Sequence, residues 1–221
     1  MSDHFTKPTA IVDGSNADAD DINDLSTAVL TGFNSLETEV DGVLANIATY
    51  NEYVLLESGS AAGGVSYLEF DVDPSYTLYK FVWNDITLST TCTIHCRVDL
   101  GAGIITTTDY HYNILSRHSN TTTSETYDSG ATSMIVRANG IAPSSMPIRG
   151  ETIARGLGTY KYATFEGQTI GFSTGVTDVQ ASVFSGVYDG SPNPITAVRF
   201  YPSAGEFSSG SIDMYGWGSI S

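Results

Sequence analysis

The sequence predicts a mainly β protein, in which an N-terminal α-helical, coiled-coil segment precedes an antiparallel β-sandwich or jelly roll. Between residues 29 and 54, apolar residues recur at spacings of four and three, the heptad pattern of a helix that packs against copies of itself. After residue 64 the chain is rich in Gly, Ser, Thr and Tyr and carries short alternating runs, which are typical of antiparallel strands. Helix and strand signals segregate along the chain, and this argues against an α/β fold.

Four segments follow from this pattern. Residues 1–17 lack periodicity and are interpreted as an N-terminal attachment arm. Residues 18–56 are predicted to form a helical coiled-coil stalk, because Asp and Asn residues suited to a helix N-terminus open it. Residues 57–64, which are Gly- and Ser-rich, are interpreted as a hinge. Residues 65–221 are predicted to form the β-sandwich head domain.

The residues of the predicted oligomerisation seam also indicate how many copies of the chain associate. β-Branched and bulky residues mix at its a and d positions, which favours a trimer over a dimer. The flanking e and g positions carry no Lys or Arg, so interhelical salt bridges are absent and the coil is expected to need the β domain or a partner. The seam consists of Val29, Phe33, Leu36, Val40, Val43, Ile47, Tyr50 and Val54.

The strand-like runs are about ten in number and are separated by Gly, Ser and Asn. Leu68, Phe70 and Val72 alternate with Glu69 and Asp71, the pattern of a sheet with one wet face. The predicted strands are Tyr67–Val72, Tyr79–Leu88, Thr91–Asp99, Asp109–Leu115, Ser133–Ala138, Tyr160–Phe165, Thr169–Ser173, Val179–Phe184, Ile195–Tyr201 and Gly210–Trp217.

The charge of the chain excludes some classes of partner. The net charge is −16, and residues 1–79 hold 14 of the 25 acidic residues but only one basic residue, Lys7. Without a basic stripe, nucleic-acid binding is not expected, because phosphate neutralisation supplies most of that affinity. No apolar run is long enough for a membrane span, and the N-terminus lacks the pattern of a secretory signal.

The two cysteines are expected to be core thiols. Cys92 and Cys96 lie on one face of a predicted strand and His95 on the other. Four residues along a strand span roughly 13 Å, beyond the reach of a disulfide. A metal site that combines the two thiols with His95 is excluded by the same alternation, and we expect neither a metal nor a cofactor.

The β domain resembles the C-terminal modules of tailed-bacteriophage tail fibres and related virion proteins. The resemblance is carried by the opening run from Tyr67 through Ile86 and by the closing run from Ile195 to Gly216, whose last strand finishes in Tyr-Gly. The stretch from Asp13 to Asn23 is similar to fibre segments that precede a helix. Residues 100–194 resemble no family. The resemblance implies a homotrimeric virion protein, attached to other tail or baseplate proteins through its N-terminal part, with the β module facing outward. It transfers no catalytic residue.

Three aromatic residues are candidate ligand-binding residues. Tyr110 and Tyr112 share one face of a predicted strand, and Trp217 lies near the C-terminus; an outward ring could stack on a sugar. The alternative is a core tyrosine with its hydroxyl capped.

Catalytic signals are weak. The G-x-S-x-G match at Ser173 has no histidine after it, as the order of an α/β-hydrolase triad requires. Glu125, Asp128, Glu151 and Glu166 are carboxylates that a glycan-cleaving enzyme could use, but the sequence does not pair them. The acidic stretch at residues 16–21 departs from a calcium loop at its Gly and Glu positions; a loose cation site between copies stays open.

The sequence therefore predicts a non-enzymatic virion protein, assembled on the phage tail after synthesis in the host cytoplasm. The expected role is recognition of a host-surface molecule, carbohydrate above all. A head or neck fibre, or a capsid decoration protein without a receptor role, is the alternative. A polysaccharide-degrading enzyme is the third possibility.

Overall fold

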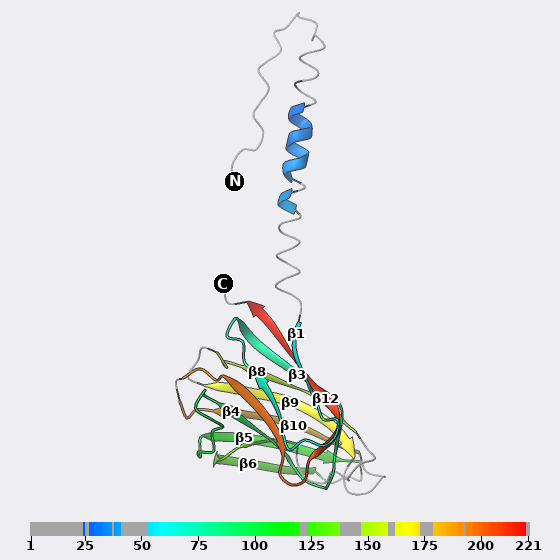
Figure 1. The fold of residues 1–221 in the computed structure, drawn as a ribbon, viewed down its shortest axis with the longest axis vertical. Coiled ribbons are helices and arrows are strands. Elements are labelled where there is room, and N and C mark those ends of the chain that lie inside the picture. The colour runs from blue at the N-terminus through cyan, green and yellow to red at the C-terminus, as the bar shows by residue number, and fades with distance from the viewer. Residues whose placement is uncertain are drawn as a thin grey trace, which may run out of the picture. The chain divides into compact units, whose positions relative to one another are not determined.

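The computed structural model describes residues 24, 27–36, 38–40, 53–119, 123–137, 147–158, 162–172, 179–191 and 193–219. The chain divides into two compact units, residues 1–51 and residues 52–221, and each is treated by itself below (Figure 1). None of the described helical residues belongs to a helix long and apolar enough to cross a membrane.

The first unit is helical where it is described, at residue 24 and over 27–36 and 38–40. These residues include the first four positions of the predicted seam. Val43, Ile47 and Tyr50 lie outside the described residues, as does the arm at residues 1–17. The described residues thus contain a short helical stretch, and a long coiled-coil helix over 18–56 is not shown.

The predicted boundary between stalk and hinge is wrong. Strand β1 spans Val54–Ser60 and pairs antiparallel with the last strand of the chain, so Val54 belongs to a sheet and not to the helical seam. Residues 57–60 are strand rather than hinge. Gly59, which suggested flexibility, permits close packing, because a Cβ there would lie 2.8 Å from Cζ of Phe70. Only residues 61–64 form the turn that follows.

Twelve strands make up the described part of the second unit. In chain order after β1 they are β2 (Leu68–Asp71), β3 (Tyr76–Leu88), β4 (Ile94–Asp99), β5 (Tyr110–His118), β6 (Thr123–Ala131), β7 (Met134–Arg137), β8 (Ile148–Arg155), β9 (Ala163–Phe172), β10 (Val179–Tyr188), β11 (Ala197–Pro202) and β12 (Phe207–Ser219).

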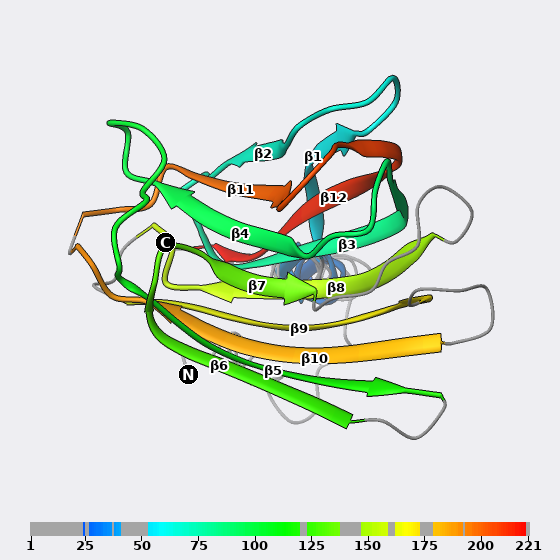
Figure 2. The ribbon, with the colours of Figure 1, turned by 90° about the horizontal axis from the view of Figure 1, so that it is seen from below.

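The strands form two antiparallel sheets. The larger has eight strands in the order β1-β12-β3-β8-β9-β10-β5-β6, and the smaller has four in the order β2-β11-β4-β7. Figure 2 shows the small sheet lying over one face of the large one. The antiparallel β-sandwich expected from the sequence is therefore present, whereas a jelly roll of eight strands in two Greek keys is not confirmed by this strand order.

The core lies between the two sheets. Phe70 of β2 and Phe200 of β11 meet Phe81 and Trp83 of β3 edge to face, with ring centroids 5.0–5.4 Å apart for Phe70–Phe81, Phe81–Phe200 and Trp83–Phe200. All four side chains are at most 1% exposed. Such aromatic pairs add about 0.5–1.5 kcal/mol each beyond their burial. The two predicted core thiols, Cys92 and Cys96, are free and buried as expected.

Most predicted strands correspond to observed ones, but three were missed. β1 was assigned to helix and hinge. β6 carries almost only exposed residues and therefore no alternation, and β8 contains Gly and charged residues that resemble a loop. The two runs from Tyr160 to Ser173 contribute to one strand, β9. Gly167, which suggested a break, lies against Phe184, whose Cζ would be 2.7 Å from an added Cβ.

Candidate functional site

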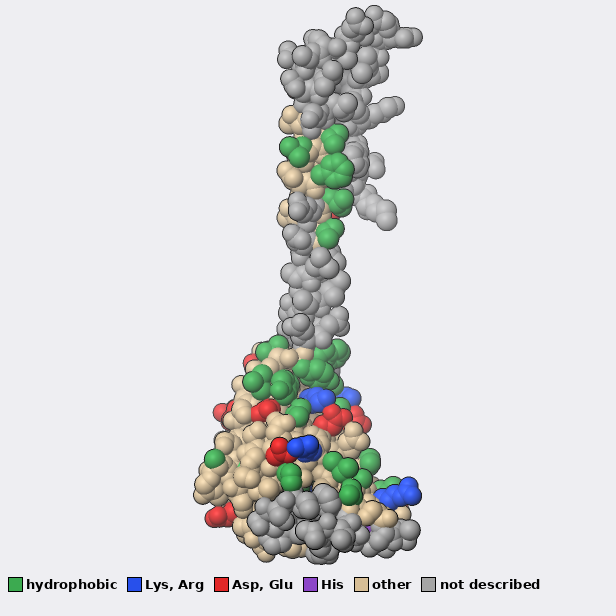
Figure 3. All heavy atoms as spheres, turned by 90° about the vertical axis from the view of Figure 1, so that its right-hand side faces the viewer, with side chains coloured by type: hydrophobic (Ala, Val, Ile, Leu, Met, Phe, Trp, Pro, Cys, Tyr) green, Lys and Arg blue, Asp and Glu red, His purple; other side chains and the backbone are tan. Residues whose placement is uncertain are grey.

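The described helical residues carry a stripe of exposed apolar side chains. Val29, Phe33, Leu36 and Val40 are 44%, 66%, 56% and 48% exposed. Figure 3 shows hydrophobic side chains gathered on the described helical segment. Burying one such side chain fully contributes about 1.5–3 kcal/mol, so the stripe favours association with another apolar surface.

Tyr110, the first predicted ligand-binding residue, is instead a core residue. Its side chain is 0% exposed. Its hydroxyl accepts a hydrogen bond from the backbone N–H of Val98 at 3.0 Å and donates to the carbonyl of Ile105 at 3.2 Å. Burial raises the pKa of this phenol. The ring is closed to a ligand, because it joins β5 to β4 inside the sandwich, and the capped-core alternative is the correct one.

Tyr112 lies at a surface cavity of about 390 Å³ over β5, β9 and β10. The cavity is also lined by His111, Asn113, Ser185 and Glu166. Burial, and then the nearby Asp128 carboxylate, raise the pKa of Tyr112.

Two polar groups of this cavity have partners. His111 Nε2 lies 3.2 Å from an Asp189 oxygen, and the Asn113 amide donates to Glu125 at 3.0 Å. Tyr127, which faces Asn113 across the strands, is 78% exposed. Tyr127 was not among the predicted ligand-binding residues, because β6 carries no strand signal.

Trp217 lies near the end of β12, where it is 36% exposed. Its ring centroid is 6.5 Å from that of Tyr53, over which the Lys80 ammonium lies at 5.5 Å. The structure therefore does not bring the three predicted ligand-binding residues together: Tyr110 is in the core, Tyr112 lines the cavity on β5, and Trp217 is separated from β5 by β3, β8, β9 and β10 in the sheet order.

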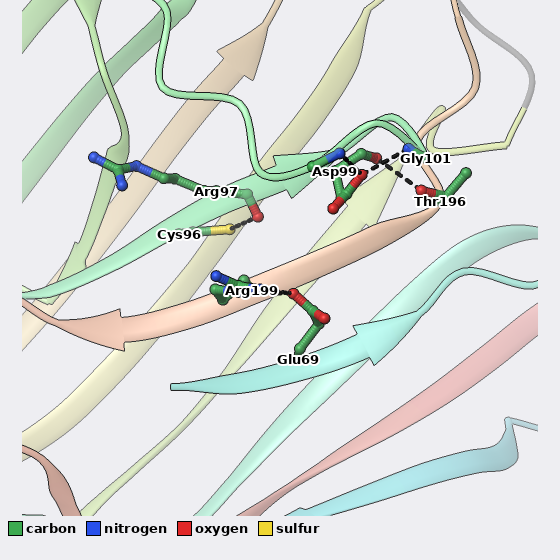
Figure 4. Close-up of polar contacts among 8 residues, drawn as sticks. Glu69, Cys96, Arg97, Asp99, Gly101, Thr196 and Arg199 are labelled. Carbon is green, nitrogen blue, oxygen red and sulfur yellow. Dashed lines mark hydrogen bonds and ion pairs between the residues drawn. The ribbon is translucent and has the colours of Figure 1, made fainter. Parts of the chain in front are cut away.

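The outward face of the four-stranded sheet carries a second group of charged and aromatic side chains. Arg97 of β4 and Arg199 of β11 face each other directly in the antiparallel register, and Glu69 of β2 faces Arg199 on its other side. In the neighbouring row, His95 faces Tyr201. We call this set, with Tyr67, the arginine face. Figure 4 shows Arg97, Arg199 and Glu69 on three adjacent strands.

Each arginine of this face lies over a tyrosine ring. The Arg199 guanidinium lies 4.0 Å from the Tyr67 ring centroid, and that of Arg97 lies 4.8 Å from the Tyr201 centroid. Arg199 also forms an ion pair with Glu69 at 2.6 Å. Arg97 donates from Nε to the Thr132 carbonyl at 2.9 Å. Among the ion pairs formed by the described residues, none includes Arg97.

His95 is a structural member of the arginine face. Its ring stacks on Tyr201 with centroids 5.4 Å apart, and its two nitrogens contact the Thr93 and Ser133 hydroxyls at 2.7 and 2.8 Å. Burial, and then the charge of Arg97, lower the pKa of His95 from 6.5 to about 4. The imidazole is therefore neutral at physiological pH, and it holds Tyr201 in place.

The alternation of the Thr91–Asp99 run already placed His95 and Arg97 on the outward face of a strand. The sequence contained no signal that Arg199, about a hundred residues later, would pair directly beside Arg97. That juxtaposition depends on the β4–β11 register.

The carboxylates considered for catalysis lie on β6, β8 and β9 of the large sheet, and two of them, Asp128 and Glu166, line the cavity over β5, β9 and β10. Glu151 pairs with Lys80 and Glu166 with Arg155, both on the large sheet, while Glu125 accepts a hydrogen bond from Asn113. Ser173 and the acidic stretch at residues 16–21 lie outside the described residues. No group of three or more His, Cys, Asp or Glu side chains within the described ranges is placed to hold a metal ion.

Comparison with known proteins finds no matching family model, no matching curated protein and no matching solved structure.

Proposed function

We propose that this chain is a non-enzymatic structural protein of a tailed-bacteriophage virion, a homotrimeric tail fibre or spike. Residues 1–17 attach it to other tail or baseplate proteins, and the β-sandwich recognises a host-surface molecule, carbohydrate above all. The observation that supports the proposal best is the exposed stripe Val29, Phe33, Leu36 and Val40, at spacings of four, three and four on a helix. A stripe this narrow suits a coiled-coil seam.

The described surface of the β domain is compatible with this role. Tyrosines are exposed or half-buried on both outward faces of the sandwich, including Tyr67, Tyr127 and Tyr201. Tyrosine provides contact area at low conformational cost, so it is common in recognition surfaces. We further propose that the sandwich is an elaborated jelly roll, in which additional strands extend one of the two sheets.

Sedimentation velocity of the full chain tests the trimer. We expect a species of three times the 23.5 kDa chain mass at micromolar concentration. Replacing both Phe33 and Leu36 with Glu should shift the protein towards monomer, because charges then replace the apolar a and d side chains. Thr31→Glu with Thr38→Glu adds the same charge off the seam and is the matched control. A monomeric wild-type chain, or equal dissociation of both double variants, would contradict the seam.

Position on the particle separates the tail proposal from its alternative, a head or neck fibre or a capsid decoration protein. Labelling the chain in assembled virions and imaging them by cryo-electron microscopy should place it at the tail. Label on the capsid surface would support the alternative and exclude a tail fibre.

A further inference from the structure

We infer that the arginine face binds an acidic saccharide, with the negatively charged group held by the Arg97 guanidinium, beside the Arg199–Glu69 ion pair. This inference rests on the proposed function for the choice of a saccharide, and it adds the binding site and the charge of the ligand. The site lies on the outward face of the four-stranded sheet, and none of its residues is among the ligand-binding residues predicted from the sequence.

Two positive charges lie directly opposite each other on the arginine face. Arg97 and Arg199 are cross-strand partners, so their Cβ atoms are about 4.5–5.5 Å apart, and like charges in that position destabilise a sheet. Glu69 offsets one of the two charges through its ion pair with Arg199. Arg97 has no ion pair among the described residues, although the whole chain has 25 acidic side chains. An external anion bound at the Arg97 guanidinium would offset the remaining charge.

Both guanidinium groups of the arginine face are held in place before any ligand binds. Each guanidinium is stacked on a tyrosine ring, and Arg97 is also fixed by its bond to the Thr132 carbonyl. Stacking leaves the N–H groups at the edge of a guanidinium able to donate, and these groups match carboxylate and phosphate oxygens in pairs. Nε and Nη2 of Arg199 already bind Glu69, whereas the described contacts of Arg97 engage only its Nε. Little side-chain entropy is then lost when a ligand binds.

Asp99, the acidic residue closest in sequence to Arg97, binds backbone groups of its own loop. One carboxylate oxygen of Asp99 accepts hydrogen bonds from the backbone N–H groups of Gly101 and Gly103, at 2.6 and 3.1 Å. Figure 4 shows the Asp99 carboxylate bonded to Gly101, within its own loop, while Arg97 extends away from it. The described contacts therefore leave the Arg97 guanidinium available to an external acid.

The overall charge limits the kind of acidic ligand. A chain of net charge −16 repels an extended polyanion such as a nucleic acid, whose affinity depends on many phosphate contacts. Salt screens distant charges beyond about 10 Å, so a single acidic group on a largely neutral saccharide experiences mainly Arg97 and the neighbouring Arg199–Glu69 ion pair. A sugar carboxylate and a sugar phosphate share this chemistry.

Isothermal titration of the full chain, at about 50 mM and about 500 mM NaCl, tests the inference. The probes are a galacturonic acid trisaccharide, glucose 1-phosphate and a neutral glucose trisaccharide. We expect binding of at least one acidic probe, weaker at high salt, and no binding of the neutral one. Arg97→Gln should lower that affinity about tenfold or more, because it removes a charged donor, and Arg97→Lys should give an intermediate loss.

Arg117→Gln is the matched control, because Arg117 is an exposed arginine on β5 of the other sheet; it should leave the affinity unchanged. The two acidic probes distinguish a carboxylate ligand from a phosphate ligand. The inference would be overturned if neither acidic probe binds, or if the neutral probe binds more tightly than the acidic ones. It would also be overturned if Arg97→Gln leaves the affinity unchanged, or if Arg117→Gln lowers it equally. The sedimentation result is independent of these outcomes, so a failed acidic site and a failed trimer can be told apart.

Discussion

Replacing Arg137 with Met should stabilise the β domain. Arg137 ends β7 and is 0% exposed. Its Nη1 donates to the Gln180 carbonyl at 2.9 Å and, in longer and weaker bonds, to the Thr169 carbonyl at 3.4 Å and the Ser182 hydroxyl at 3.5 Å. Among the described residues, its Nε and Nη2 have no hydrogen-bond partner and no carboxylate pairs with it. A buried cation without a counter-charge is costly.

The pKa of Arg137 gives the size of that cost. Burial lowers it from 12.5 to about 10, and each unit corresponds to 1.36 kcal/mol. The native state therefore carries a cost of about 3 kcal/mol for the charged side chain. The charged hydrogen bond to Gln180 offsets roughly 2 kcal/mol of this. Met fills similar space without the charge, so the free energy of unfolding should rise by about 1 kcal/mol.

Urea denaturation at pH 7, followed by tryptophan fluorescence, measures the change. A gain of about 1 kcal/mol corresponds to about 2–4 °C in the melting temperature of a domain of this size. Arg117→Met removes an exposed arginine and is the matched control, which should change stability by at most about 0.5 kcal/mol. A loss of about 3 kcal/mol or more in Arg137→Met would refute the reasoning, since that is the cost of breaking a compensated buried pair.

Three further predictions concern the sandwich. The folded chain keeps His95 neutral down to about pH 4, so the free energy of unfolding should fall as the pH drops from 6.5 towards 4. His95→Gln should reduce that fall by about 2–3 kcal/mol, measured from denaturation curves at pH 7 and pH 4.5. The same fall in wild type and variant would contradict burial of the neutral ring. Tyr110→Phe leaves the Val98 N–H without its partner and should cost about 1–3 kcal/mol of unfolding free energy; a neutral change in thermal melting would exclude the capped-core assignment. Gly186→Ala places a Cβ 2.6 Å from Sδ of Met134 and should cost about 1–3 kcal/mol through overpacking, whereas a change below 0.5 kcal/mol in urea would show that Met134 moves aside freely.

The predicted fold was most accurate where alternation was regular. The run Thr91–Asp99 contains β4, with Ile94, Cys96 and Val98 fully buried as expected. The predicted secondary structure was wrong where the local residue pattern favours one element and the tertiary contacts stabilise another. Val54 continues the heptad spacing, yet it lies in β1, because pairing with β12 satisfies its backbone and the neighbouring Leu56 packs against the core.

The candidate site was predictable only in part. Period-two alternation placed Tyr110 and Tyr112 on one face, but it could not say which face was the core; the strands that cover β5 decide that. Tyr110 is therefore buried, and the aromatic residue most exposed near the cavity is Tyr127, on a strand without alternation. Arg97 was placed outward, but its neighbour Arg199 could not be inferred, because pairing between strands a hundred residues apart is a tertiary property.

The sequence by itself determined the local preferences of this chain: an acidic helical region with a narrow apolar stripe, and a less acidic β domain whose strands bury thiols and aromatic rings. These features depend on spacing along the chain, which periodicity measures directly. Only the tertiary structure decided which faces are covered and which distant strands are neighbours. It therefore also decided where Tyr110 lies and that two arginines meet on an outward sheet face, because register and layer packing are set by contacts that no local pattern encodes.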